Sequence, residues 1–368
     1  MTLLAHLFFQ LLLSTVFAVG ALGFVVFPAM AVSAVHKLGG VSLGELLRFL
    51  PMTGVELAPY LISLGFLLAV VSTFGRLAAD KEWIAIQMAG IHPLRMLLPG
   101  LLLAAGLGAL TYKLASDVSP RWKVQQRQLS ASARANSFRR LAPGRTEIEF
   151  GGFYLSAAER EGNLFRDVQI QLRDTRKASG EPGPYEGDQF LVAKEIELTV
   201  DGDLLIVDAT EYTFVAEADQ GEGRARTKQG GTAIAPRISD FVEERSIDTA
   251  RAKYRTSAQI REALARGEVK PEKLLENRFM LHSRIAVAFT YLVFLLIGVP
   301  TGLWLRSGGQ LSGLGFAALY AFSYYILSLR LGGDLAEDGT LPPWLAAWTT
   351  NLIGMVIGTV LLFRTIRR

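Results

Sequence analysis

Long apolar runs on either side of a polar middle dominate the hydropathy pattern of this chain. A helix needs roughly 20 predominantly apolar residues to cross about 30 Å of hydrocarbon. Six runs have this character, three before the polar middle and three after it: Leu7–Val35, Leu57–Phe74, Leu94–Ala115, Ile285–Leu305, Leu311–Leu329 and Trp344–Phe363. The pattern predicts an α-helical membrane protein with six transmembrane helices, arranged three plus three.

The polar middle contains short runs in which apolar and polar residues alternate. Such alternation is typical of half-buried strands, and it occurs over 168–172 and 196–200. Asp201-Gly202 then precedes a further run over 204–207, which is a strong hairpin signal because a type I′ turn needs positive φ. We also expect strands over Thr146–Leu155 and Glu211–Val215, and a loop over Ala218–Gly231. Short strands without helices between them predict a central all-β sandwich or jelly roll.

These patterns divide the chain into three parts. Residues 1–116 hold the first three spans, 117–280 the β domain, and 281–368 the last three spans. Helices are predicted at both margins of the β domain, over Pro120–Arg140 and Ser257–Arg266. The first is rich in arginine and lysine, which fits either a solvated face or a contact with anionic headgroups.

Basic residues in short loops indicate the orientation in the membrane. Seven lie on one side and three on the other: Arg76, Lys81, Arg95, Arg306, Arg364, Arg367 and Arg368, against Lys37, Arg48 and Arg330. Both termini are therefore expected in the cytoplasm and the β domain outside, in the periplasm of a cell with two membranes. The formal net charge is only +4, without a basic stripe for nucleic acid.

Candidate catalytic chemistry is sparse. Nothing matches the glycine-rich loop that cradles nucleotide phosphates, so any ATP is expected to be hydrolysed by another subunit. The four histidines have no metal-ligand spacing, and cysteine is absent from the sequence. We expect a chain that is not an enzyme and that binds no metal or cofactor of its own.

A short helix is predicted between the second and third spans. Asp80 suits its N-cap, Glu82 the positive end of its dipole and Gly90 its C-terminal stop, which gives a helix of about nine residues. Pro93 fits the first turn of the next span. Trp83, Ile84, Gln87, Met88 and Ile91 are expected on one face. Such a helix, joined rigidly to two spans, can transmit motion from a docked protein.

This segment resembles the LptF and LptG family, the permease subunits of the lipopolysaccharide exporter. The positions that fit the family pattern are Gly75, Arg76, Leu77, Asp80, Glu82, Gly90 and Ile91. The likeness continues at Leu50-Pro51, Pro59, 281–286 and 339–348, and so covers nearly the whole chain. The chain departs from the family in lacking a basic segment at its start. In the β domain only Gly152-Phe153 and the strand pattern agree.

The resemblance implies a mechanism and a set of partners. Two such permeases, held by a dimer of a separate ABC ATPase, extract lipopolysaccharide from the outer leaflet of the inner membrane. A periplasmic jelly roll receives the acyl chains and passes them to a matching jelly roll on a bitopic, LptC-like protein. The cytoplasmic helix docks on the ATPase with Glu82 at the contact, supported by Arg76, Asp80, Trp83 and Gly90.

Two further sets of residues have alternative readings. His36, Lys37 and Arg284 at outer helix ends either snorkel to the headgroup layer or bind lipid phosphates. Small residues recur every fourth position at Gly309, Gly313, Ala317 and Ala321, and also at Gly100, Ala104 and Gly108 and at Gly354 and Gly358. Such stripes let helices approach closely, within one chain or between subunits. Because spans one and five line the lateral gates in the family, the stripe in span five suits either a gate seam or ordinary packing.

Two other functions compete with lipopolysaccharide export. One is a membrane subunit of another ABC-type system, for lipoprotein release or mechanotransmission, which usually has four spans. The other is a membrane-anchored enzyme or scaffold, which a phosphate-releasing activity of the isolated chain would favour.

Overall fold

The computed structural model describes residues 3–38, 43–139, 147–150, 153–172, 189–201, 204–216, 224–229, 231–234, 251–305, 309–328 and 332–367. The chain forms two compact units. The helical unit comprises Met1–Ser33, Leu47–Gln126 and Thr249–Arg368, and the β unit comprises Ala34–Leu46 and Arg127–Asp248.

Five described helical segments are long and apolar enough to cross a membrane. They contain α1 (Leu3–Leu38), α2 (Leu43–Ala79), α4 (Leu98–Lys113), α9 (Leu274–Trp304) and α12 (Pro343–Ile366). Each of them overlaps one of the six predicted spans, so that five of the predictions have a matching helix. A helix, α10 (Gly309–Ile326), also forms where span five is predicted, but it is not among these five.

The third span is part of a longer helical segment. The 3₁₀ turn η1 (Pro93–Leu97) opens it, with Pro93 in the first turn as predicted, and leads into α4. The π-helical turn η2 (Leu114–Val118) then joins α4 to α5 (Ser119–Arg139). The helix predicted over Pro120–Arg140 is confirmed. One of its cations, Lys123, pairs with Glu56 of α2 at 3.1 Å.

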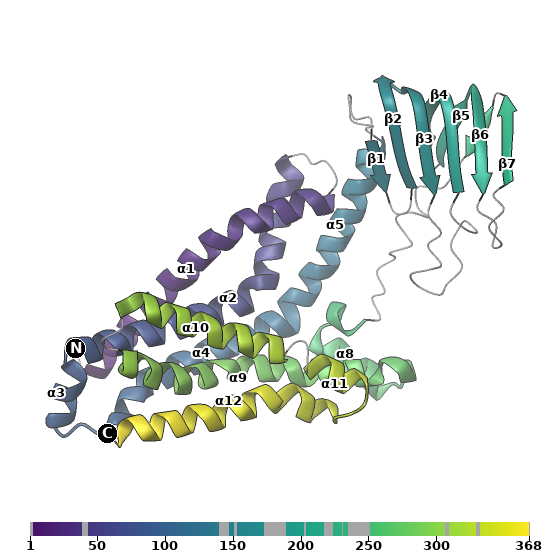
Figure 1. Ribbon diagram of the computed structural model, residues 1–368. Coiled ribbons are helices and arrows are strands. Elements are labelled where there is room, and N and C mark those ends of the chain that lie inside the picture. Colours follow the sequence, from purple (N-terminus) through teal and green to yellow (C-terminus); the bar gives the residue numbers. More distant parts are fainter. Residues whose placement is uncertain are drawn as a thin grey trace. The chain divides into compact units, whose positions relative to one another are not determined.

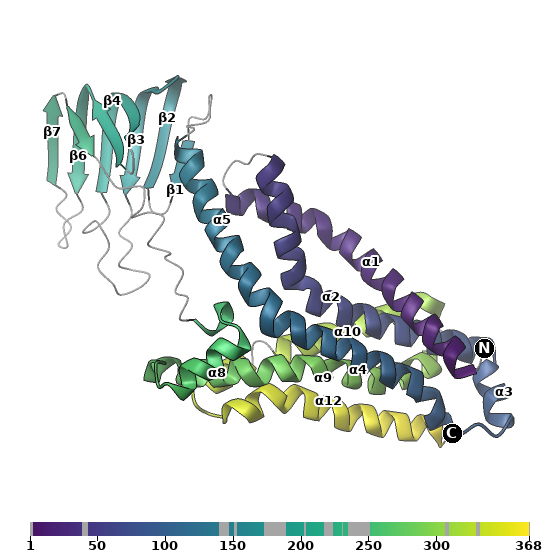
Figure 2. The same ribbon diagram turned by 180° about the vertical axis from the view of Figure 1, so that it is seen from behind.

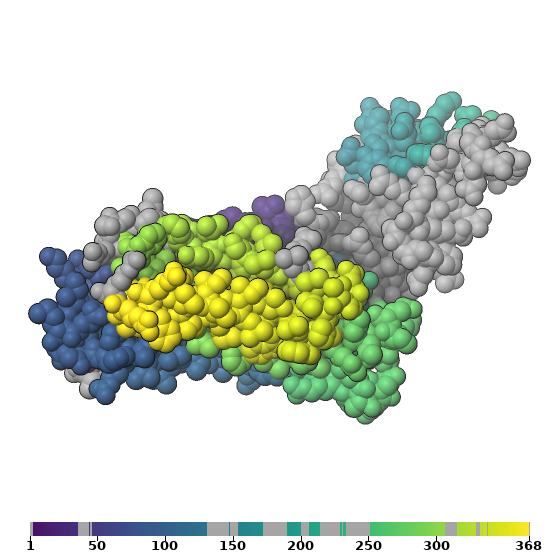
Figure 3. All heavy atoms as spheres, turned by 60° about the horizontal axis from the view of Figure 1, so that its bottom comes forward, coloured from purple at the N-terminus to yellow at the C-terminus, as the bar shows by residue number. Residues whose placement is uncertain are grey.

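Within the helical unit, α4, α9 and α12 lie side by side (Figures 1 and 2). Figure 3 shows α10 and α12 together on one face of this unit. Short helices mark its two ends. The chain termini and α3 (Glu82–Met88) lie at one end, and α8 (Ser257–Ala265) and α11 (Gly332–Glu337) lie at the other (Figures 1 and 2).

Helix α9 packs closely against its neighbours because glycines on those helices face it. A Cβ atom at Gly108 of α4 would lie 2.6 Å from the carbonyl oxygen of Ala288, and one at Gly358 of α12 would lie 2.7 Å from the Cβ of Leu296. Gly100 and Gly354 meet other α9 side chains as closely. The small-residue stripes of spans three and six therefore pack within this chain.

Tyrosine hydroxyls connect the buried helix faces. Tyr324 of α10 donates to Asn351 of α12 over 2.5 Å and is 2.8 Å from the hydroxyl of Thr290 on α9. Asn351 in turn donates to the carbonyl of Ala286. Two further pairs join α4 to α9 and α2 to α10, namely Thr111 with Tyr291 and Ser63 with Tyr325. In an apolar surrounding each of these groups needs a partner, so the network specifies how the helices fit together.

The β unit contains one antiparallel sheet of eight strands among the described residues. The strands are β1 (Glu147–Phe150), β2 (Phe153–Glu161), β3 (Leu164–Leu172), β4 (Gln189–Asp201), β5 (Leu204–Ala209), β6 (Glu211–Ala216), β7 (Arg224–Gln229) and β8 (Thr232–Ile234). The order is β1-β2-β3-β4-β5-β8, with β6 paired to β4 and β7. Asp201 pairs with Leu204, which confirms the predicted hairpin.

Two predictions for the β domain, one of a strand and one of a loop, were wrong. The single strand expected over Thr146–Leu155 is the hairpin of β1 and β2, in which Phe150 pairs with Phe153. Two consecutive glycines separate these strands in the sequence, and glycine inside a strand pattern weakens it. The loop expected over Ala218–Gly231 contains β7. The polar sequence of β7 does not indicate a strand, and its pairing with β6 supplies the hydrogen bonds.

Two successive residues face outward on each of three neighbouring strands and at one junction between strands. They are Ala158 and Glu159 on β2, Arg166 and Asp167 on β3, Lys194 and Glu195 on β4, and Thr210 and Glu211 at the junction of β5 and β6. Regular alternation would move the apolar residues to the opposite face beyond this line. The doubled outward positions keep them on one face, and Asp167 has an unusual φ of 50° there.

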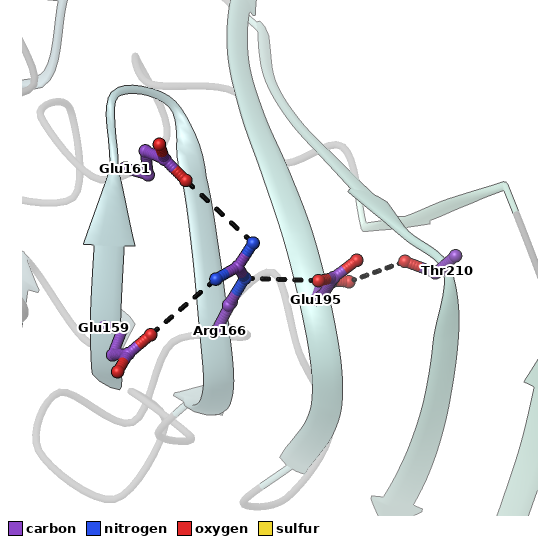
Figure 4. A network of polar contacts seen from close by, with 5 residues as sticks. All are labelled: Glu159, Glu161, Arg166, Glu195 and Thr210. Carbon is purple, nitrogen blue, oxygen red and sulfur yellow. Dashed lines mark hydrogen bonds and ion pairs between the residues drawn. The ribbon is translucent and has the colours of Figure 1, made fainter.

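Figure 4 shows the polar contacts along this line. The guanidinium of Arg166 lies 3.3 Å from the carboxylate of Glu195, 3.8 Å from Glu159 and 3.9 Å from Glu161. These side chains are exposed, and exposed ion pairs contribute only about 0–1 kcal/mol each. The network therefore adds little stability and marks the solvent face of the sheet.

Candidate functional site

The short helix α3 lies between the second and third spans at the end of the helical unit that also holds both termini (Figure 1). It begins at Glu82 and ends at Met88, so it is shorter than expected. The predicted N-cap was wrong. Lys81 occupies that position with φ 61°, and it forms no side-chain capping bond. The chain turns from α2 into α3 through this left-handed residue, which leaves Asp80 one position too early to cap.

Gly90 ends α3 as predicted. Its φ is +78°, in the left-handed region that favours glycine. The Gly90 amide donates to Gln87 at 3.0 Å, and the Ile91 amide donates to Ile86 at 3.3 Å. These two bonds form a Schellman motif. Ile86 and Ile91 both pack on the core of the helical unit, so the turn is fixed by hydrogen bonds and by burial.

The faces of α3 differ from the prediction. Trp83 is buried, and its ring packs edge-on against Phe74 of α2, with 6.1 Å between the ring centroids. Ile84 and Met88, which were expected beside Trp83, point away from the core and are 45% and 84% exposed. Glu82 is also exposed. The outward face of α3 therefore combines two exposed apolar side chains with a carboxylate.

A close approach of backbones connects this site to the transmembrane helices. Gly75, on the last turns of α2, lies against Gly302 of α9, where an added Cβ would lie 2.7 Å from the Val71 carbonyl and 3.0 Å from the Gly75 amide. Arg76 follows Gly75 and is exposed. Since α2 continues through one tight turn into α3, the helix that carries α3 is also the helix that contacts α9.

The predicted phosphate-binding residues have different environments. His36 and Lys37 lie in the last turn of α1, and their side-chain contacts lie outside the described part of the chain. Arg284 is buried, with 5% of its surface exposed. It donates to the hydroxyl of Ser257 and to the carbonyls of Ala252 and Arg255. These bonds give Arg284 a role inside the chain, and its contact with lipid stays a prediction.

The small-residue stripe of span five forms part of α10. Ala317 and Ala321 are buried in the apolar core of the helical unit together with Tyr324. Gly309 and Gly313 belong to the same helix, but their surroundings lie outside the described residues. Phe316, Leu319 and Phe322 occupy its exposed side. The gate role of this stripe stays a prediction.

Sequence reasoning missed three residues that shape the site: Lys81, Ile86 and Gly302. A left-handed lysine gives no local signal, because the conformation is imposed by the packing of α2 and α3. Ile86 was overlooked because seven helical residues contain too few apolar positions to define a face. Gly302 follows Gly298 at the four-residue spacing of a small-residue stripe, a signal that the sequence reading passed over, and its partner Gly75 is more than two hundred residues away in the sequence.

Comparison with known proteins identifies one matching family. Its description is lipopolysaccharide export system permease LptF/LptG, and the match covers residues 5–364. No curated protein matches the chain.

Proposed function

The chain belongs to the LptF/LptG family of lipopolysaccharide export permeases, and on this basis we propose that it is the permease subunit of an ATP-driven exporter. The multi-pass helical unit supplies the membrane passage, and the chain is a transport subunit. In our proposal it extracts lipopolysaccharide from the outer leaflet of the inner membrane and delivers it to a periplasmic bridge of jelly-roll domains.

The observation that carries the docking part of this proposal is the construction of α3. It is capped at its C-terminus, anchored by buried Trp83 and continuous with α2, and it presents Glu82, Ile84 and Met88 outward. We propose that a cytoplasmic ABC ATPase dimer docks on this face. Hydrolysis of ATP then moves α3, and the Gly75–Gly302 contact passes the movement to α9.

The proposal includes the complete architecture and its partners. Helix α10 serves as the sixth membrane span, and the β unit is a periplasmic jelly roll. A paralogous permease completes the passage, and an LptC-like bitopic protein receives the lipid. This chain binds no cofactor, since ATP is used by the partner subunit.

Replacement of Glu82 tests the docking role. We expect Glu82→Ala to reduce ATPase co-purification about tenfold, since loss of a charged contact of about 1.4 kcal/mol corresponds to that factor. The fold should persist, because the helix-dipole effect of this residue is only about 0.3–1 kcal/mol. Affinity purification of the full chain followed by mass spectrometry of bound proteins and lipids measures both results.

Glu268→Ala is the matched control, since it removes an exposed carboxylate just beyond α8, at the opposite end of the helical unit. It should leave ATPase recovery unchanged. Unchanged recovery with Glu82→Ala would exclude the docking role of this residue. Absence of any ATPase or lipopolysaccharide with the natural chain would contradict the proposed function itself.

Lys37 remains our candidate for contact with lipid phosphates, because it ends α1 at the outer side of the predicted topology. A photoreactive residue at position 37 should crosslink to lipopolysaccharide in membranes. Capture of bulk phospholipid alone would indicate that Lys37 only snorkels to the headgroup layer.

A further inference from the structure

Arg284 is a buried cation whose hydrogen bonds all run to one short segment of the chain. Its Nη1 lies 3.0 Å from the hydroxyl of Ser257, and its Nη2 lies 3.2 Å and 2.8 Å from the carbonyl oxygens of Ala252 and Arg255. Among the described residues, none of the ion pairs within 4.0 Å involves Arg284. The guanidinium therefore binds two main-chain carbonyls and one hydroxyl of this segment.

The segment that it holds is residues 251–266, here called the strap. The strap follows the β sheet in sequence and precedes α9, and it consists of the 3₁₀ turn η3 (Ala252–Tyr254) and α8. It is well ordered locally: Thr256 and Gln259 form a reciprocal capping box at the start of α8. Ala252, Ile260 and Ala263 are buried.

One bond of Arg284 reaches a position where the strap lacks regular structure. Arg255 is extended between η3 and α8, so its carbonyl has no place in a helical ladder. A buried carbonyl without a partner is costly, and a guanidinium can satisfy several acceptors at once because its five N–H groups form a rigid fork. A second contact joins the strap to α4, where Arg261 donates to the Tyr112 hydroxyl over 3.4 Å.

We infer that Arg284 is a positioning residue that clamps the strap to the outer end of α9, so that the chain returning from the β sheet enters the membrane as one rigid piece with that helix. The consequence for transport rests on the proposed function. If α9 moves when the ATPase acts on α3, the clamp carries that movement to the strap and onward along the chain. Loss of the clamp would separate ATP hydrolysis from lipid delivery.

Trypsin tests the clamp directly, since the strap contains five cleavage sites, at Arg251, Lys253, Arg255, Arg261 and Arg266. Cleavage of a folded segment follows how often it opens. In the full chain in detergent, we expect Arg284→Met to accelerate strap cleavage about tenfold or more, since loss of buried charged bonds favours opening. Arg284→Lys should restore part of the protection against trypsin, because the lysine ammonium still donates hydrogen bonds, although it lacks the forked geometry of the guanidinium.

Arg278→Met is the matched control, because it removes an exposed arginine and one tryptic site from the same helix. It should leave strap cleavage unchanged. If Arg284→Met does not accumulate in membranes, Ser257→Ala removes one acceptor, and we expect about threefold faster cleavage. Strap cleavage at the natural rate in Arg284→Met, or in Ser257→Ala where that variant must serve instead, would overturn the inference.

A transport assay with the assembled complex separates positioning from general folding. We expect Arg284→Met to retain ATP hydrolysis while lipid release to the acceptor protein falls. Equal loss of both activities, or undiminished release despite a loosened strap, would overturn the positioning role. If the natural chain itself supports no lipid release, the proposed function fails, and the trypsin experiment still decides whether the clamp exists.

Discussion

Individual buried hydroxyls have consequences because hydrocarbon offers them no alternative partner. Tyr324 joins three helices through one oxygen, since it contacts Asn351 and Thr290 from α10. We expect Tyr324→Phe to destabilise the fold by about 1 kcal/mol, the usual size for a hydrogen bond between membrane helices. Thermal unfolding of the purified chain in detergent measures this loss.

Tyr320 provides a control for the loss of a tyrosine hydroxyl from the same helix. It lies one turn earlier on α10, and among the described residues its hydroxyl has no hydrogen-bond partner. Tyr320→Phe should therefore unfold at the same temperature as the natural chain. Equal behaviour of the two variants would show that the Tyr324 bonds contribute nothing measurable.

At the scale of elements, glycines decide how closely the helices approach α9. Gly108 faces the Ala288 carbonyl so closely that a methyl group would clash with main chain, whereas Gly106 on the same helix has open space around its Cβ position. We expect Gly108→Ala to cost roughly 1–3 kcal/mol through overpacking. Gly106→Ala should be neutral or slightly stabilising, since alanine is the better helix former. Thermal unfolding of both variants in detergent is the measurement.

The paired design isolates packing from helix propensity, because both substitutions are glycine to alanine in one helix. Destabilisation by both variants, or by neither, would contradict the close contact of α4 and α9. Gly302 likewise leaves no room for a methyl group, and its contact with α2 connects the membrane helices to α3.

At the scale of the whole molecule, α3 and α8 mark opposite ends of the helical unit. Because the natural chain contains no cysteine, a single introduced thiol reports its side of the membrane without background. In intact cells, a membrane-impermeant maleimide should label Glu268→Cys, beside α8, but not Gln87→Cys on α3. Both positions are exposed in the fold.

Permeabilised cells should label both thiols, which controls for their reactivity. Labelling of both positions from the same side in intact cells would refute the proposed topology. It would also remove the basis for an ATPase contact at α3 combined with a periplasmic β domain.

Hydropathy alone located five helical segments that are long and apolar enough to cross a membrane, because the thickness of hydrocarbon sets the length of an apolar run and charges mark its ends. Local signals were equally reliable where one residue type satisfies one backbone requirement, as with Gly90 at the end of α3 and Asp201 in the hairpin before β5. The family likeness also followed from residues near each other in sequence, such as Gly75 to Ile91, and it was confirmed over residues 5–364.

Long-range packing determined the rest, since it depends on atoms that are distant in sequence. Trp83 packs against Phe74. This contact determines the left-handed turn at Lys81 and the outward direction of the Met88 side chain. The partner of Arg284 was invisible in the sequence because a cation at a helix end suits lipid phosphate as well as main-chain carbonyls. Only the folded chain brings Ala252 and Arg255 to this guanidinium, so the function of a charged residue here is decided by which acceptors the tertiary structure places beside it.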